Sequence, residues 1–99
     1  MFQGDYGKPR PAVVVETDYL ASVDSVLLCL VTSDILEHSG RRIDLEPSAS
    51  NGLRLRSQVQ ADKIFALRRQ KCGKPIGVLN ARELEQLNEA LMLVLGLGD

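Results

Sequence analysis

The side chains that most often carry enzyme chemistry are scarce in this sequence. There is one histidine, His38, and there are two cysteines, Cys29 and Cys72. No histidine pair, histidine–cysteine dyad or three-ligand metal site can be assembled around a single histidine with these neighbours. His38 lies in a Glu-His-Ser-Gly segment, where a hydrogen-bonded turn residue is a more common role than a lone general base. We therefore expect no metal site, and we expect Cys29, inside an apolar run, to be a small core residue.

Nucleotide-binding motifs are absent from the sequence as well. There is neither a Gly-x-x-x-x-Gly-Lys loop nor a Gly-x-Gly-x-x-Gly loop. These are the glycine patterns that hold the phosphates of nucleoside triphosphates and of dinucleotides. Nucleotide hydrolysis and dinucleotide-dependent redox chemistry are therefore disfavoured, and we expect the protein to work without a cofactor.

Positive charge is concentrated in the middle of the chain. The net charge is −1, but residues 40–75 carry nine lysines and arginines against three acidic residues, whereas residues 1–39 carry two against six. Such a region can face the phosphates of a nucleic acid or an acidic peptide. From composition alone, an ordinary solvated surface explains it equally well. Only four aromatic residues are present, which argues against an extended platform for stacking bases.

The length and composition fit one small folded domain. The chain has 99 residues, of which 44% are hydrophobic and 25% are charged. A chain of this length buries only about 60 to 65% of its unfolded surface, so pairing with a second copy would add stability. No apolar stretch approaches the roughly 20 residues that cross a bilayer, and no secretory signal opens the sequence. Two cysteines are too few for a disulfide framework, so we expect a homodimer in the reducing cytoplasm, with no membrane segment.

The hydrophobic pattern predicts a strand-rich body over residues 9–79. Residues 11–16 and 24–32 are β-branched or apolar runs of strand length. Residues 41–46 and 58–67 alternate between apolar and polar types, as strands with one solvated face do. Glycine, proline and Asn-Gly signals predict loops over residues 47–52 and 71–77.

A helix is predicted over residues 80–96. Leucines and valines recur there every three or four residues, which gives the segment one apolar face. Asn80 and Glu83 are spaced as in a capping box, and Gly96 is placed as a C-terminal stop. Together with the strands, this predicts a mainly β fold with a C-terminal helix, built as a small, strongly bent sheet or half-open barrel.

Several short motifs occur in an order that resembles one known family. They are Lys8-Pro9-Arg10-Pro11 running into Val13-Val14-Val15, then Thr32-Ser33 at the end of an apolar run, Gly52-Leu53, Ser57-Gln58-Val59 and Asp62-Lys63-Ile64. Each motif alone is common. Five of them in this order, before a closing helix, resemble the MazF/PemK (Kid) family of toxin endoribonucleases over residues 4–97.

The resemblance implies a fold, an activity and partners. The fold would be an SH3-like half-open barrel of the CcdB/MazF/Kid toxin type, with residues 1–99 forming a single toxin domain. The activity would be sequence-selective, metal-independent cleavage of single-stranded RNA by attack of the 2′-hydroxyl, as in an mRNA interferase. The protein would form a homodimer and be held inactive by the acidic C-terminal segment of a cognate antitoxin.

The resemblance also assigns site residues. Arg10 matches the family's catalytic arginine and Thr32 its catalytic threonine, each at the end of an expected strand. An arginine fork can bind two phosphoryl oxygens, and fixed donors of this kind are worth about 100- to 1,000-fold in rate each. Substrate-positioning residues would be Ser33, Ser57 and Lys63. Basic residues that would contact the RNA are Lys8, Arg41, Arg42, Arg54 and Arg56.

Purely structural roles for the two proposed catalytic residues stay open at this point. Arg10 could be a loop residue that forms a salt bridge with a carboxylate. Thr32 could be a hydroxyl at a strand end that caps the turn at Leu36.

Two features depart from the family pattern. The family opens with a further strand of the Arg-Gly-Asp/Glu-Ile-Val type, and we expect that strand to be missing here because Met1 falls inside the loop that normally follows it. Its absence would leave an open sheet edge, to be covered by dimerisation unless the natural chain begins further upstream. The second departure is Lys63, where the family commonly has glutamine.

Two other functions fit the same fold. One is a non-catalytic gyrase poison of the CcdB type, and the other is an inactive member that only binds an antitoxin. The CcdB branch uses a tryptophan in its C-terminal tail, whereas this chain has no tryptophan and ends Leu95-Gly96-Leu97-Gly98-Asp99. The sequence therefore favours the ribonuclease.

Overall fold

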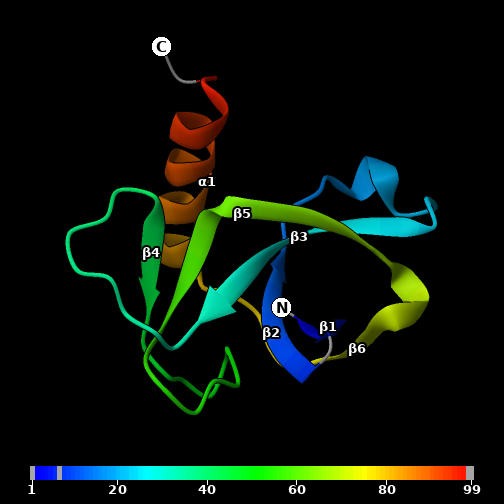
Figure 1. The fold of residues 1–99 in the computed structure, drawn as a ribbon, viewed down its shortest axis with the longest axis horizontal. Helices are drawn as coiled ribbons and strands as arrows, with labels where there is room; N and C mark the ends of the chain where they lie inside the picture. Colours follow the sequence, from blue (N-terminus) through cyan, green and yellow to red (C-terminus); the bar gives the residue numbers. More distant parts are fainter. Residues whose placement is uncertain (1, 7, 98–99) are drawn as a thin grey trace.

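Six β-strands and one α-helix are found in the structure, a computed structural model that describes residues 2–6 and 8–97 (Figure 1). The side chains of residues 2–6, 8 and 9 lie outside this description. In chain order the elements are β1 (Phe2–Tyr6), β2 (Lys8–Val14), the short 3-10 helix η1 (Asp18–Leu20), β3 (Ser25–Thr32), β4 (Arg42–Leu45), β5 (Ser57–Arg68), the 3-10 helix η2 (Arg69–Lys71), β6 (Cys72–Pro75) and α1 (Ala81–Leu95).

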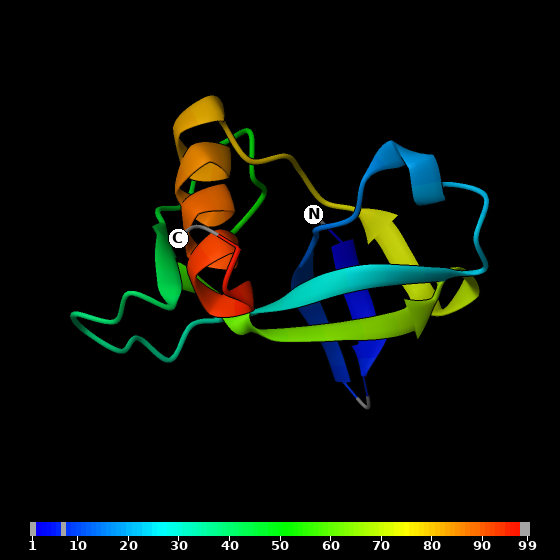
Figure 2. The ribbon, with the colours of Figure 1, turned by 90° about the horizontal axis from the view of Figure 1, so that it is seen from above.

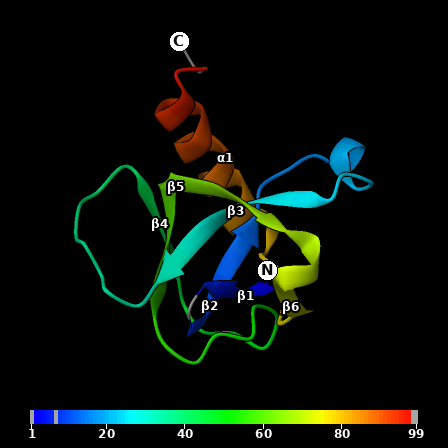
Figure 3. The same cartoon turned by 45° about the vertical axis from the view of Figure 1, so that its right-hand side comes forward.

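The strands form one antiparallel sheet in the order β4-β5-β3-β2-β1-β6. Only the three residues of η2 separate the end of β5 from the start of β6, yet β6 pairs with β1 at the far edge of the sheet. The sheet must therefore curl until that edge meets the end of β5, which gives a half-open barrel (Figure 3). This confirms the bent, mainly β fold with a C-terminal helix that the sequence predicts.

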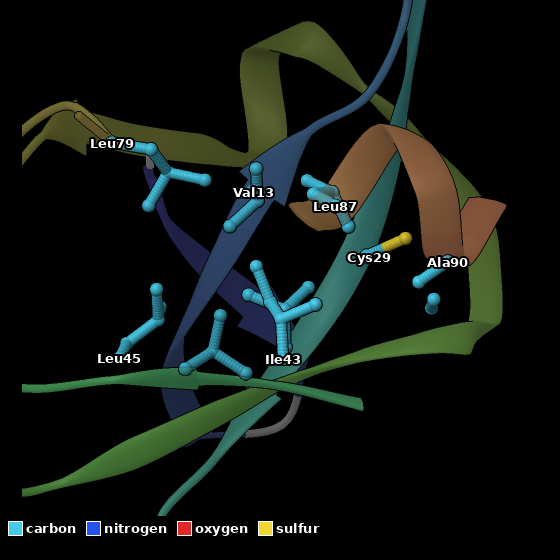
Figure 4. Close-up of a cluster of buried hydrophobic side chains, with 10 residues drawn as sticks. Val13, Cys29, Ile43, Leu45, Leu79, Leu87 and Ala90 are labelled. Carbon is cyan, nitrogen blue, oxygen red and sulfur yellow. The ribbon is translucent and has the colours of Figure 1, made fainter. Parts of the chain in front are cut away.

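The curl gives the sheet two buried faces, and the side chains of β2 alternate between them. Val13 belongs to the cluster covered by α1, where Leu87 and Ala90 of the helix pack against the strands (Figure 4). Ala12 belongs to a second cluster inside the curl, together with Leu28. Because successive residues of a strand point to opposite faces, one β-branched run supplies both clusters. Each fully buried leucine or valine contributes roughly 1.5–3 kcal/mol.

Cys29 lies in the cluster covered by α1 and is 0% exposed. Burial raises the pKa of its thiol to about 11, with a smaller contribution from the charge of Asp62. The sulfur therefore stays protonated at neutral pH and is a poor nucleophile. This confirms the prediction that Cys29 is a core residue.

Helix α1 begins and ends as the sequence predicts. Asn80 Oδ1 accepts the Glu83 N–H at 2.7 Å, and Glu83 Oε1 accepts the Asn80 N–H at 2.9 Å, which completes the capping box. Gly96 follows the helix with φ 71°, a left-handed conformation that suits glycine. Within residues 2–6 and 8–97, no helix has the length and apolar character needed to cross a membrane.

The expectation that the family's first strand is missing was wrong. β1 pairs with β2 from Phe2 opposite Ala12 to Tyr6 opposite Lys8, and its other side pairs with β6. The segment Gln3-Gly4-Asp5-Tyr6 has weak strand propensity, because glycine and aspartate are depleted in strands. It is a strand because neighbours on both sides satisfy its backbone groups, and the edges of the sheet are β4 and β6 instead.

The segment 71–77, predicted as a loop, also contains a strand, β6. Its glycine and proline are compatible with an edge strand, where one side of the backbone needs no partner. Propensity alone could not reveal it, because the pairing with β1 depends on the curl of the whole sheet.

An ion pair stabilises the end of the molecule that lies away from α1. There, η1 lies near the start of β3 and the end of β5 (Figure 2). Arg69 Nη2 donates to Glu16 Oε2 at 2.6 Å and to the carbonyl of Leu20 at 2.8 Å, while Nε donates to the carbonyl of Val23. Glu16 Oε1 accepts the N–H of Leu27 at 3.1 Å, and the Glu16 side chain is only 5% exposed. The hydrogen bond from Arg69 is the main cause that lowers the pKa of Glu16.

Replacing Glu16 with glutamine should destabilise the protein in a pH-dependent way. The pKa of Glu16 is lowered from its usual 4.5, so its contribution is complete above that value and is lost as pH falls through the folded-state pKa. The midpoint of thermal unfolding of E16Q should therefore lie below that of the native chain at neutral pH, and the gap should narrow in acid. E85Q, which removes the same charge from an exposed position on α1, is the control. A gap that stays constant with pH would contradict the assignment.

Candidate active site

A cleft of about 730 Å³ opens where β2, the end of β3 and the segment 52–57 meet. Its lining residues are Arg10, Pro11, Val31, Thr32, Ser33, Gly52, Leu53, Arg54, Leu55, Ser57 and Ile76. Five of the residues predicted for the site are among them, namely Arg10, Thr32, Ser33, Arg54 and Ser57. The fold thus brings together side chains that lie more than forty residues apart in sequence.

Arg10 reaches the cleft from the first half of β2, and its side chain is exposed. Among the side chains that the structure describes, none forms an ion pair or hydrogen bond with Arg10. The alternative role in a structural salt bridge therefore has no support within those residues. Within the described residues the guanidinium is unpaired, and its planar donor fork suits an anionic ligand.

Thr32 is the last residue of β3, and its Oγ1 accepts the N–H of Asp34 at 3.0 Å. The alternative role of capping Leu36 is taken by another residue, because the N–H of Leu36 donates to Gln58 Oε1 at 3.0 Å. A hydroxyl that accepts one hydrogen bond keeps its own hydrogen to donate. Thr32 is therefore held in place while its O–H remains available in the cleft.

One wall of the cleft is formed by the segment 52–57, and a buried amide side chain holds the loop that leads into it. Asn51 is 0% exposed, and its Oδ1 accepts the N–H groups of Ser48 and Leu53, both at 3.0 Å. Its Nδ2 donates to the carbonyl of Glu46 at 2.8 Å. One side chain thus satisfies three backbone groups of a loop, which substitutes for the regular hydrogen bonds the loop lacks.

Two glycines allow this wall to pack closely against the segment that precedes α1. Gly52 has φ 69°, and a Cβ there would collide with the carbonyl oxygen of Ile76. A Cβ at Gly77 would collide with the backbone of Ser50 and Asn51. Backbone therefore packs directly on backbone, an approach that only glycine permits.

Arg54 and Ser57 complete this wall in different ways. Arg54 is exposed and, among the described side chains, makes no ion pair. Ser57 is buried, and its Oγ donates to the carbonyl of Leu55 at 2.9 Å. Arg54 is therefore a second cation at the cleft that has no acidic partner among the described side chains, while Ser57 shapes the turn that carries Leu55.

Comparison with known proteins identifies the family. A family model described as "PemK-like, MazF-like toxin of type II toxin-antitoxin system" matches residues 2–95. The chain belongs to this family. The endoribonuclease MazF9 of Mycobacterium tuberculosis is 33% identical over 94 residues, which cover 89% of this chain and 79% of the relative. The probable endoribonuclease MazF of Mycolicibacterium smegmatis is 28% identical over 91 residues, covering 92% of this chain and 84% of the relative.

Solved structures share the fold of this MazF-like toxin. A mycobacterial structure described as an endoribonuclease in complex with its cognate antitoxin superposes with a TM-score of 0.86. Its sequence is 22% identical, and the match covers 99% of this chain and 92% of that one. The expected MazF-type barrel is confirmed, and the family match includes β1.

Several cations predicted to contact RNA in this MazF-like toxin are not cleft-lining residues. Arg56 lies within 3.4–3.7 Å of three carboxylates, those of Glu37, Asp44 and Glu46. Arg41 lies 3.8 Å from Asp62. Arg42 donates hydrogen bonds to a backbone carbonyl and to Gln58, and Lys63 is exposed on β5. Lys8 belongs to β2, but its side chain lies outside the described residues.

The remaining side chains considered for chemistry also lie away from the cleft. His38 is exposed in the connection from β3 to β4 and has φ 61°, as a turn residue does. No cluster of three or more metal-ligating side chains occurs in the described part of the chain. The sequence did not indicate the apolar lining of the cleft or the two buried amides, Asn51 and Gln58. The Asn-Gly pair at 51–52 predicted a loop, but it did not predict that the Asn51 side chain is buried and binds three backbone groups.

Alanine at Gly52 should destabilise this toxin more than alanine at Gly96. Both glycines have φ near 70°, so each substitution carries a left-handed alanine that costs about 1–2 kcal/mol. Only Gly52 faces a backbone oxygen, whereas nothing lies within 4 Å of a Cβ at Gly96. The clash should add a further ~1–3 kcal/mol. Denaturant unfolding of G52A and G96A measures the difference, and equal losses would contradict the close packing described for Gly52.

Proposed function

We propose that this single-domain toxin, residues 1–99, is a sequence-selective, metal-independent endoribonuclease whose reaction is carried by Arg10 and Thr32. Its family membership makes the chain a toxin of a type II toxin–antitoxin pair, and its relatives are named endoribonucleases. The observation that supports the site is the convergence of Arg10, Thr32 and Arg54 on one cleft. The substrate is single-stranded RNA, whose unpaired bases can enter such a cleft.

In the reaction, the ribose 2′-hydroxyl oxygen bonds to the adjacent phosphorus as the bond from phosphorus to the 5′-oxygen of the next nucleotide breaks. The 2′ proton passes to solvent, and the departing 5′-oxygen takes up a proton from solvent. Negative charge grows on the phosphoryl oxygens as the new bond forms. Arg10, which keeps its positive charge, binds two of these oxygens with its donor fork. Thr32, with its oxygen fixed by Asp34 and its hydrogen free, donates to the phosphoryl group or to the departing oxygen. Both donors are in place before the reaction, which is the condition for effective electrostatic stabilisation.

The remaining lining of the cleft suits the rest of a nucleotide. Leu53, Leu55 and Ile76 give apolar surface on which a base can lie. Arg54 offers a cation to a neighbouring phosphate, and Ser33 offers a hydroxyl for an edge of a base. Phosphate contacts would hold the strand and the apolar and hydroxyl contacts would select among bases.

The same cleft fits the antitoxin as a partner. Arg10 and Arg54 attract carboxylates for the same reason that they attract phosphates, so an acidic C-terminal segment of a cognate antitoxin would compete with RNA. A solved structure of similar fold is described as a complex with its cognate antitoxin. We further propose a homodimer, since Met92, Leu93 and Leu95 leave 47–67% of their surfaces exposed on α1. We also propose that the toxin acts in the cytoplasm, whose reducing conditions suit its two free cysteines.

Neither the family match nor the relatives favour a gyrase poison. An inactive member that only binds an antitoxin would have the same fold, and it is distinguished from the ribonuclease by the cleavage experiment below.

The test is cleavage of a long mixed-sequence RNA in EDTA, with the ends mapped by primer extension. We expect the native chain to make discrete cuts and T32A to cut about 100- to 1,000-fold more slowly, because a fixed donor is lost. T32S keeps the hydroxyl and is the matched control, and circular dichroism checks the fold of each variant. Cleavage by T32A and by R10A at the rate of the native chain would refute the site. No cleavage by the native chain, with tight binding of an antitoxin peptide, would identify the inactive member.

A further inference from the structure

Arg42 is one of the cations predicted to contact RNA, but its guanidinium is committed to the backbone that follows Thr32. Its Nη1 donates to the carbonyl of Asp34 at 2.8 Å and to Gln58 Oε1 at 3.1 Å. The N–H of the same Asp34 donates to Thr32 Oγ1 at 3.0 Å. One residue of backbone therefore connects Thr32 on one side to Arg42 on the other.

Gln58 fixes the next part of this segment. Its Oε1 accepts the Leu36 N–H at 3.0 Å, and its Nε2 donates to the Leu36 carbonyl at 3.2 Å and to Asp44 Oδ1 at 2.9 Å. Gln58 is 4% exposed, and with the bond from Arg42 both of its polar atoms make two hydrogen bonds. A buried amide with all its positions used has one orientation, because any rotation leaves polar groups unpaired.

The strand register places this hydrogen-bond network next to the proposed catalytic residue, Thr32. Gln58 is the register partner of Thr32 in the pairing of β3 with β5, and of Asp44 in the pairing of β4 with β5. The segment 33–36 leaves the sheet immediately after Thr32. Among the hydrogen bonds of the described residues, those with Arg42 and Gln58, together with the one from Asp34 to Thr32, fix the path of this segment.

We propose that Arg42 and Gln58 form a clip that positions the Thr32 hydroxyl, and that Arg42 therefore acts on the reaction without touching RNA. The inference rests on the proposed function, because it assigns a positioning role at the same site. The physical reason is geometric. The Thr32 rotamer is held by the Asp34 N–H, and Arg42 holds the carbonyl on the other side of the Asp34 Cα, so releasing Arg42 lets the Asp34 backbone turn and the hydroxyl leave its reactive position. A displacement of about 1 Å at a reacting group can cost on the order of 100-fold in rate.

A role in positioning and a role in binding predict different kinetics for Arg42. A phosphate contact acts through charge, so its loss raises KM and lowers the slope of log KM against log salt by about one. A positioning residue acts after RNA is bound, so its loss lowers kcat at saturating RNA and leaves KM and the salt slope nearly unchanged. Arg54, which lines the cleft and makes no ion pair among the described side chains, should show the first behaviour and is the reference for it.

The experiment compares R42Q, R42K, R54Q and R82Q in single-turnover and steady-state cleavage at several salt concentrations. R82Q removes the same charge from the exposed surface of α1 and controls for net charge. We expect R42Q to lower kcat by about 10- to 100-fold with KM within about threefold. R42K, whose ammonium can donate to both oxygens, should recover part of the rate. A raised KM with a reduced salt slope, or an unchanged kcat, would overturn the proposal.

A second measurement does not depend on activity. Hydrogen exchange of the Asp34 and Leu36 amides should be faster in R42Q than in R82Q, because the clip protects both groups. Unchanged exchange at both amides would overturn the clip whether or not the protein cleaves RNA. Failure of the native chain to cleave RNA would instead contradict the proposed function, and the exchange data would still decide between a clip and a surface cation.

The variant Q58E adds a pH dependence that a merely structural role would not produce. The new carboxyl keeps its acceptors for the Leu36 N–H and for Arg42, but it loses the donors to the Leu36 carbonyl and to Asp44. Two carboxylates then face each other across the former 2.9 Å hydrogen bond, with Arg42 beside the new group and Arg56 3.7 Å from Asp44. Protonation of the new group restores the donor to Asp44. The rate of Q58E relative to the native chain should therefore rise as pH falls, and a constant ratio would count against the proposal.

Discussion

The short connection between β5 and β6 is the constraint on which the rest of this structure depends. Three residues of η2 must carry the chain from a strand near one edge of the sheet to the strand at the other edge. A flat sheet cannot satisfy that distance, because each intervening strand adds about 4.8 Å. The sheet therefore curls, and the curl creates two buried faces from one layer of strands. It also brings β2, the end of β3 and the segment 52–57 to one mouth, where the cleft lies.

Both walls of the cleft are held by amide side chains that act in place of regular backbone pairing. Asn51 satisfies three backbone groups of one wall, and Gln58 satisfies both groups of Leu36 beside the other. Such buried polar groups cost free energy unless they are fully paired, and both of these are extensively paired. The irregular segments of the cleft thus have hydrogen-bond partners for their backbone groups, as strands do. A preorganised donor, the role proposed for the Thr32 hydroxyl, needs a frame of this kind.

Much of the fold follows from local sequence patterns, and the parts that do not are those set by distant partners. The apolar runs of β3 and β5 and the capping box of α1 are visible in a few adjacent residues, so they could be predicted. β1 and β6 could not, because each is short, contains glycine and becomes a strand only when the curled sheet pairs the two. In the candidate site, the resemblance supplied Arg10 and Thr32. It could not distinguish Arg54, which makes no ion pair among the described side chains, from Arg42 and Arg56. Those two are engaged by Gln58 and Glu37, which lie 16 and 19 positions away in sequence.

That distinction among the cations shapes the electrostatics of the surface. Arg56 is surrounded by three carboxylates and Arg69 is bound to Glu16, so these guanidinium groups are compensated by neighbours and attract an anion weakly. Arg10 and Arg54 have no such compensation among the described side chains. A basic stretch of sequence therefore gives a strong positive potential only at those cations that have no carboxylate nearby in the fold. Because a phosphate and a carboxylate are both attracted to such cations, the charge arrangement of the cleft is the physical basis for the proposed competition between RNA and an acidic peptide.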